Sequence, residues 1–242
     1  MPNFSGAVQI APRNLWSSST TQEAPLGARF EAEGRTFRYC RAGATALVAG
    51  NVIQAPAQIT THQQLTPAAA AAGATQIVAA LGATAATANQ YAGGWAIIDT
   101  TPGEGYMYPI SGHAAVLSSG NITLNIDRAS GIEVALTTSS RVSLQANPYN
   151  GVIQSPVTTL TGAVVGVAVY PIAINGYGWI QTHGPAAVLI AGTPGVGLAV
   201  VVPATAAGAV VIDGAATATK VVGSMMVTGV DGKIQAVLLT IN

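Results

Sequence analysis

The sequence has few ionisable side chains. Among its 242 residues, nine Lys plus Arg and nine Asp plus Glu amount to 7% and cancel to a net charge of 0, whereas an ordinary globular domain is about a quarter charged. With no excess of basic residues there is no electropositive surface to neutralise a row of phosphates, which excludes nucleic acid as the main partner. A neutral surface also repels its own copies weakly. We therefore expect a protein that works while packed against other proteins.

Cysteines, export signals and long hydrophobic runs are also lacking. The single cysteine, Cys40, can form neither an intrachain disulfide nor a thiolate metal site, and we expect it to be a small buried apolar residue. Residues 1–19 interleave polar residues where a secretory signal needs an apolar run. Residues 186–212 carry no charge, but Pro194, Pro203 and several glycines divide them into short pieces. We expect neither an export signal nor a membrane partner.

Short segments rich in β-branched residues, separated by Gly, Pro, Asn and Asp, dominate the rest of the chain. This pattern predicts an all-β fold, a β-sandwich or β-barrel, with at most one short helix. The one candidate for such a helix is residues 66–72, where Thr66 can cap it and Pro67 can occupy its first position. The expected strands are residues 35–39, 75–81, 95–99, 106–110, 121–126, 132–136, 141–145, 163–170, 178–182, 186–190, 198–202, 209–212, 221–227 and 233–241.

The N-terminal residues 1–25 show no sustained hydrophobic period and contain a Ser/Thr run at 17–21. We expect an extended arm, tethered by a few apolar residues, in front of a β-rich body of residues 26–242. Removal of residues 1–22 should then leave the body stable and weaken attachment to a partner. Two Gly-Trp steps, at 94–95 and 178–179, are too short to indicate an internal repeat.

The chain offers little to catalysis or metal binding. His62, His113 and His183 lie far apart in the sequence with no acidic neighbour at ligand spacing, which favours solvated or core histidines. Asp99 and Glu104 flank a predicted hairpin turn, and a pair of carboxylates about 5 to 10 Å apart is what a glycosidase needs. Turn chemistry already explains both residues. We expect no enzyme, no metal and no cofactor.

Several glycine- and aromatic-rich segments resemble virion structural proteins of tailed bacteriophages, in particular the capsid decoration, or cement, proteins. They are residues 34–50 (GRTFRYCRAGATALVAG), 91–98 (YAGGWAII), 103–108 (GEGYMY), 147–151 (NPYNG) and 177–184 (YGWIQTHG). The C-terminal segments 184–190, 208–211, 222–227 and 234–239 are similar to the β-tulip-like modules of that class. Because these motifs are structural glycines and aromatics, the resemblance implies a fold and a role but no catalytic site.

The resemblance implies a β-tulip-like lobe of residues 26–56 with 150–242 and an inserted β lobe of residues 57–149. It further implies a homo-oligomer, often a trimer in this class, that binds the major capsid protein on the outer surface of the virion and stabilises the shell. Such a protein is made in the host cytoplasm. The expected interface residues are Arg29, Glu31, Glu33, Arg35, Arg38, Arg41, Trp16, Trp95 and Trp179.

Two alternatives stay open. A phage tail or fibre protein would bind a host surface glycan through aromatic side chains such as Trp95, Tyr106, Tyr108 and Trp179. A glycan-degrading enzyme would use Asp99 and Glu104.

Overall fold

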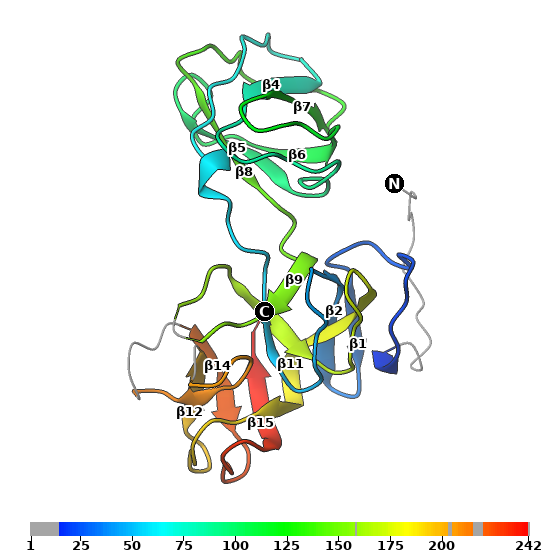
Figure 1. Cartoon of the computed structure of the whole chain (residues 1–242), viewed down its shortest axis with the longest axis vertical. Coiled ribbons are helices and arrows are strands. Elements are labelled where there is room, and N and C mark those ends of the chain that lie inside the picture. Colours follow the sequence, from blue (N-terminus) through cyan, green and yellow to red (C-terminus); the bar gives the residue numbers. More distant parts are fainter. Residues whose placement is uncertain (1–14, 158, 203–204, 215–219, 242) are drawn as a thin grey trace. The chain divides into compact units, whose positions relative to one another are not determined.

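The computed structural model describes residues 15–157, 159–202, 205–214 and 220–241. Its regular elements are strands, apart from short 3-10 turns such as η2 (Thr60–His62), which confirms the expected all-β class. The chain divides into two compact units: unit 1 comprises Met1–Ala57 and Pro148–Asn242, and unit 2 comprises Gln58–Asn147 (Figure 1). The sequence placed the corresponding boundaries at 56/57 and 149/150. Among the described residues, no helix is long and apolar enough to cross a membrane.

Unit 1 is built on one branched sheet. Five of its strands, in the order β2-β9-β3-β10-β11, close into a ring because β11 also pairs with β2. Buried side chains from these strands form one cluster, which includes Cys40, as expected for this residue. The strands of unit 1 are β1 (Arg29–Ala32), β2 (Arg35–Ala42), β3 (Val52–Gln54), β9 (Asn150–Gln154), β10 (Val164–Ala168), β11 (Tyr177–Leu189), β12 (Ala199–Val202), β13 (Val211–Ile212), β14 (Lys220–Met225) and β15 (Ile234–Thr240).

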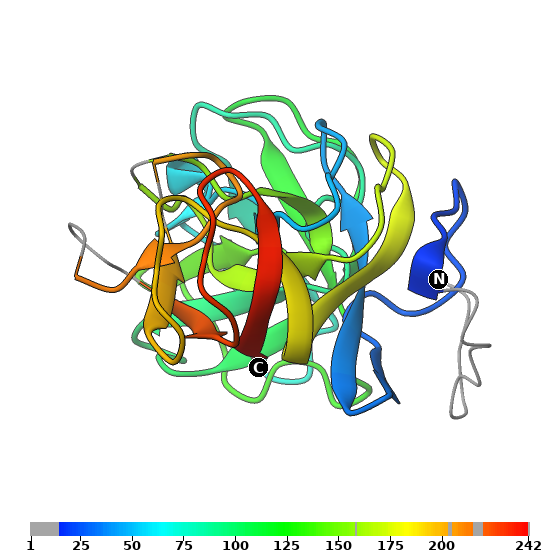
Figure 2. The ribbon, with the colours of Figure 1, turned by 90° about the horizontal axis from the view of Figure 1, so that it is seen from below.

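Strand β11 joins the ring to the rest of the sheet. Its first half, residues 177–183, pairs with β2, and its second half, residues 183–189, pairs with β15, as Figure 2 shows for the yellow strand between the blue and red ones. The sequence predicted two strands here. They are one strand because Gly184 has a φ of 85°, which lets the backbone bend without interrupting the ladder. Beyond this bend, Ala186 and Val188 point into a second core, shared with β12, β14 and β15.

Unit 2 is a five-stranded barrel with the strand order β4-β7-β6-β5-β8. In β7, Ile122, Leu124 and Ile126 alternate with exposed residues and fill the interior. The strands are β4 (Gln76–Ala80), β5 (Trp95–Thr100), β6 (Met107–Gly112), β7 (Asn121–Ile126) and β8 (Arg141–Gln145).

The segment 65–70 closes this barrel, and the candidate helix at residues 66–72 does not form. Leu65 and Val142 of β8 exchange two backbone hydrogen bonds of 2.9 Å, and Pro67 bridges to Ala79 of β4. A helix that Gly73 limits to about two turns is marginal in water. An extended conformation instead satisfies backbone groups on two flanking strands.

Other strand expectations need correction as well. The sequence did not predict β1, β3 or β9, which are short or mixed in polarity. Residues 132–136, expected to be a strand, form only a single bridge at Leu136.

The chain leaves unit 1 after β3 and returns to it through β9. These two strands are hydrogen-bonded antiparallel neighbours, with Ile53 opposite Gln154 and Gln54 opposite Ile153. The whole of unit 2 therefore stands in the position of a hairpin loop between β3 and β9.

Six tight turns in the described chain share one local arrangement. In each, a residue that makes a single bridge is followed by a four-residue turn, and the N–H of the turn's last residue donates to the carbonyl of its first residue at 2.9–3.2 Å. The bridge residues lie in pairs that exchange two backbone hydrogen bonds of 2.8–3.2 Å. The three pairs are Leu47 with Ile172, Ala70 with Leu136, and Ala86 with Val116.

The third residue after the bridge has a positive φ in five of these six turns, as in a type II turn. These residues are Gly50, Gly73, Asn89, Ser119 and Asn175. The turn is therefore a recurrent local motif, although the sequence showed no repeat. Its signature is one backbone conformation that Gly, Asn and Ser all satisfy here.

The described part of the expected arm packs on unit 1. Leu15 and Ala24 are each 2% exposed and lie in a core with Phe37 and Trp179. Ser19 exchanges backbone hydrogen bonds of 2.9 and 2.8 Å with Tyr177. Residues 1–14 lie outside the described residues. The expectation that residues 1–22 can be removed without loss of stability is corrected, because that deletion removes Leu15 from a core.

We predict that Leu15→Ala lowers the free energy of unfolding by about 2–5 kcal/mol, the range for emptying a buried leucine site. Denaturant unfolding of the full chain measures this change. Val48→Ala is the matched control, because Val48 is 54% exposed and its truncation should cost little. Equal stability of the Leu15→Ala variant and the wild type would show that residues 15–25 are not part of the core.

Gly73 tests the recurrent turn. An added Cβ at this position meets nothing within 4 Å. The cost of a substitution is therefore only the strain that a side chain adds to a backbone with a φ of 84°. Gly73→Ala should destabilise by about 1 kcal/mol, and Gly73→Asn by less, because asparagine tolerates this conformation. Thermal unfolding of both variants compares them, and the reverse order would contradict the turn assignment.

Candidate interaction surface

The outer face of β11 and β15 is apolar and exposed. The register of the two strands places three pairs of residues directly opposite each other on this face, and none of the six is charged. The pairs are Pro185 with Leu238, Ala187 with Ala236, and Leu189 with Ile234. Ile234 is 50% and Leu238 40% exposed. Alternation in β15 carried the signal for this face, but the sequence analysis assigned it no role.

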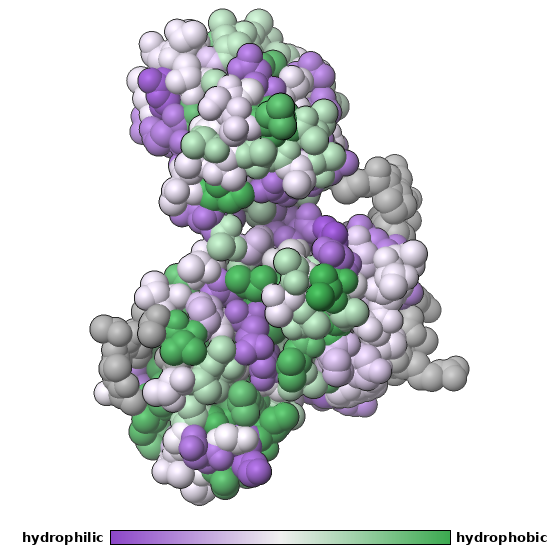
Figure 3. All heavy atoms as spheres, in the orientation of Figure 1, coloured by the Kyte–Doolittle hydropathy of each residue, from purple (hydrophilic) through white to green (hydrophobic). Residues whose placement is uncertain are grey.

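A groove of about 480 Å³ lies along this face. Ala187, Ile234 and Val227 line one side, and Trp16, which is 49% exposed, lies at the other. Figure 3 shows hydrophobic residues gathered on unit 1 over the region of β12, β14 and β15. Contiguous exposed apolar surface of this kind marks sites of interaction.

Arg35 is the charged member of the groove lining among the described residues. Its guanidinium is ion-paired with Glu33 and lies 5.5 Å from the ring centroid of Trp16 and 5.3 Å from that of Phe37. The ion pair and the two aromatic rings hold Arg35 at the rim. The groove itself therefore presents little net charge.

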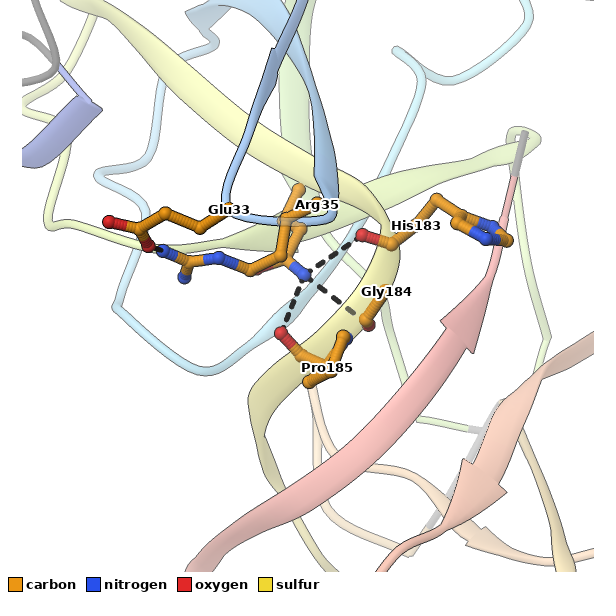
Figure 4. A network of polar contacts seen from close by, with 6 residues as sticks. Glu33, Arg35, His183, Gly184 and Pro185 are labelled. Atoms are coloured by element: carbon orange, nitrogen blue, oxygen red, sulfur yellow. Dashed lines mark hydrogen bonds and ion pairs between the residues drawn. The ribbon is translucent and has the colours of Figure 1, made fainter.

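Gln181 fixes the backbone under the groove. Its side-chain Nε2 donates to the carbonyl oxygens of His183, Gly184 and Pro185 at 3.0, 3.3 and 2.8 Å, as the dashed lines in Figure 4 show. Gln181 is 1% exposed, so its buried side-chain amide needs hydrogen-bond acceptors within the protein, and these three carbonyl groups supply them. This contact holds the bend of β11 in one shape.

The charged residues expected at an interface do not form one cluster. Side chains alternate along β2, so Arg38 lies on one face of the sheet, while Arg35 and Arg41 lie on the other. Arg29 is directly opposite Arg38 and forms an ion pair of 2.5 Å with Glu31. Arg41 donates to the side chain of Asn175 at 3.0 Å.

The three tryptophans also lie in different places. Trp16 borders the groove. Trp179 is 3% exposed, with its ring centroid 5.0 Å from that of Tyr39, and it belongs to the core of unit 1. Trp95 begins β5 in unit 2 and is partly buried.

Of the aromatic residues considered for glycan stacking, Tyr108 is buried, as Trp179 is. Tyr108 is inaccessible, and its hydroxyl accepts a hydrogen bond of 3.0 Å from the backbone N–H of Glu133. Its ring stacks on that of Tyr106, which is 39% exposed, with the centroids 5.9 Å apart. Tyr106 is thus the accessible member of this pair.

Two of the histidines meet inside unit 2 around Tyr91. The Tyr91 hydroxyl bonds to Nδ1 of His62, and the Tyr91 backbone N–H donates to Nε2 of His113 at 3.1 Å. Nε2 of His62 donates to the carbonyl of Thr84 at 2.9 Å, and Nδ1 of His113 donates to that of Ala114 at 2.8 Å. His113 Nε2 accepts from a backbone N–H and His113 Nδ1 donates to a carbonyl, so this ring is in its neutral form with the proton on Nδ1.

This network has clear electrostatic consequences. Burial lowers the pKa of His113 below its ordinary value, with nearby His62 adding to the effect and the hydrogen bond to Ala114 opposing it. Burial raises the pKa of the Tyr91 hydroxyl, which therefore stays protonated. His183, by contrast, lies in unit 1 and is exposed. Among the residues that the structure describes, no group of three or more His, Cys, Asp or Glu could hold a metal ion.

Of the two carboxylates considered for glycoside hydrolysis, Asp99 lies within β5 and not in the turn, whereas Glu104 is a turn residue as expected. Asp99 accepts hydrogen bonds from Ser143 of β8 and from Thr100. Glu104 lies exposed in the connection from β5 to β6, between Gly103 and Gly105, both of which have positive φ.

Comparisons with known proteins identify no relative: no protein-family model, curated protein or solved structure matches the chain.

We predict that His113 makes stability depend on pH. The unfolded chain binds a proton at this residue below pH 6.5, whereas the folded chain does so only at lower pH, so stability is fully present above pH 6.5 and declines as the pH falls toward the folded pKa. The uncharged variant His113→Asn should show a smaller decline over this interval. Unfolding midpoints at pH 7.5, 6.5 and 5.5 compare the two proteins, and parallel profiles would contradict the prediction.

Proposed function

We propose that the chain is a virion structural protein of a tailed bacteriophage, a decoration protein that binds the outer capsid surface and stabilises the shell through protein contacts. The observation that carries this proposal is the uncharged apolar face of β11 and β15 with its groove. A protein-binding surface has a core depleted of charge and enriched in aromatic and methionine side chains. Trp16 and Met226, both 45–49% exposed, border or flank this face.

The distribution of exposed apolar residues supports the same proposal. Among the residues that the structure describes, thirteen of the sixteen exposed large hydrophobic side chains lie in unit 1 and three lie in unit 2. Unit 1 therefore supplies the main contact surface in this proposal, for the major capsid protein or for further copies of the chain. With a net charge of 0, copies gathered on a shell repel one another little.

The small number of ionisable groups fits a structural role. The described carboxylates of Asp99 and Glu133 are engaged in local hydrogen bonds or ion pairs, and His62 and His113 in a buried network. These groups hold local structure together and are spread over different elements. Such a composition suits a protein that acts through its contact surface and does not need reactive side chains.

The first test is copy number. Purified particles of the phage that encodes this chain should contain it in numbers comparable to the major capsid protein, measured by quantitative mass spectrometry. A few copies per particle would contradict a decoration role and favour a tail or fibre component.

The second test places the contact on the groove. Ile234→Asp should weaken rebinding of purified protein to particles that lack it by at least about tenfold, or about 1.4 kcal/mol, because an unpaired carboxylate would enter an apolar interface. Leu117→Asp is the control: Leu117 is 82% exposed in unit 2 and lies on a different surface. Equal binding by Ile234→Asp and wild type would exclude the groove as the contact.

A further inference from the structure

A second pocket of unit 1, of about 370 Å³, lies on the face of the β1–β2–β11 sheet to which Arg38 points, away from Arg35 and the groove. Its lining residues are Arg29, Thr36, Arg38, Thr182 and His183. They offer two guanidinium groups, an imidazole and two hydroxyls. Among the described residues, no Asp or Glu lines it.

Strand register explains why these side chains meet. Arg29 of β1 lies directly opposite Arg38 of β2, and Thr36, two residues before Arg38, lies opposite His183 of β11. Residues two apart on a strand share a face. The basic groups thus come from three adjacent strands whose ladders hold them in place.

Arg38 is only partly satisfied by the protein. Its Nη1 donates to the carbonyl of Gly27 at 3.0 Å, but its Nε is buried and has no hydrogen-bond partner within the described chain. An unpaired buried donor on a charged group is costly, and each such group calls for an explanation. Because this Nε is inaccessible, a ligand in the pocket would meet the terminal nitrogens of the guanidinium instead, and Nη2 makes no hydrogen bond within the described chain.

Arg29 retains donors for a ligand as well. Its ion pair with Glu31 joins side chains that are 58% and 64% exposed, so water screens it. A bound carboxylate would add to this contact without having to break it. Guanidinium forks match the planar geometry of carboxylates.

We propose that this pocket binds the carboxylate of an acidic side chain on a partner protein. The proposal rests on the proposed function in that the partner is a protein that the chain contacts. Arg38 holds the carboxylate, Arg29 and His183 surround it, and the hydroxyl of Thr36 is available to donate to it. The Thr182 hydroxyl already donates to the carbonyl of Thr36 at 3.4 Å. The volume admits an Asp or Glu side chain together with its neighbouring backbone, which a site for a lone small ion does not need.

The experiment titrates the full chain with a short synthetic peptide that contains two adjacent glutamates, and with its glutamine analogue. Backbone amide NMR shifts report the binding. The glutamate peptide should shift the amides of Thr36, Thr182 and His183, while the glutamine analogue should not. Arg38→Gln should weaken peptide binding at least tenfold, and Arg38→Lys, which keeps the charge but not the fork, should give an intermediate loss.

Arg141→Gln is the matched control, because Arg141 of unit 2 donates to backbone carbonyls of Thr138 and Ser140 and lies outside the pocket. Its variant should bind the peptide like wild type. Undiminished binding by Arg38→Gln, an equal loss in Arg141→Gln, or shifts with inorganic phosphate but not with the peptide would each overturn the proposal. Arg38→Lys serves as the test if Arg38→Gln does not fold. The titration uses neither capsid shells nor groove variants. A negative result would therefore exclude carboxylate binding in this pocket without contradicting the proposed function.

Discussion

Reciprocal backbone hydrogen bonds between paired turns are the interaction on which both units depend. A chain with so few charged side chains has little opportunity to specify its fold through ion pairs. The three ion pairs found in the described part of the chain are all formed by exposed or partly exposed side chains. The bridges between residues 47 and 172, 70 and 136, and 86 and 116 instead tie together segments far apart in the sequence. Each bridge orients the turn and the strand that follow it, so one local device positions strands in both units.

Much of the fold was predictable because it depends on local patterns. Alternation of polar and apolar residues gave β7 with correct bounds, and the predicted bounds of β8 were also correct. Runs of valine marked β10, β12 and β14 within a few residues. The parts of the fold that were not predicted depend on pairing between segments far apart in the sequence. The alanine run at residues 66–72 has high helix propensity, but the edges of β4 and β8 recruit it as an extended segment. Gly184 looks like a strand breaker in sequence, yet pairing on both sides carries β11 through it.

The candidate surfaces were less predictable than the strands. Arg29, Arg35 and Arg38 are close together in the sequence, which suggests one charged cluster. Because successive side chains of a strand point to opposite faces, Arg35 lines the groove and Arg38 lines the basic pocket. His183 joins Arg38 only through the pairing of β2 with β11, across more than 140 residues of sequence. Trp179 shows the opposite error: a large aromatic suggests an interface, but the segment that contains Leu15 covers it. Which face is covered depends on tertiary contacts that no local pattern reports.

The pairing of β3 with β9 has an evolutionary consequence. A hairpin stem needs only that its two strands meet, and the entropic cost of closing the connection rises slowly, by about 0.6 kcal/mol for each doubling of its length. An entire barrel, residues 58–147, can thus be gained, exchanged or lost while the strands of the host sheet, β9 included, keep their register. The stem makes this chain modular at a single point, where lineages can add new surface without redesigning the domain that carries it.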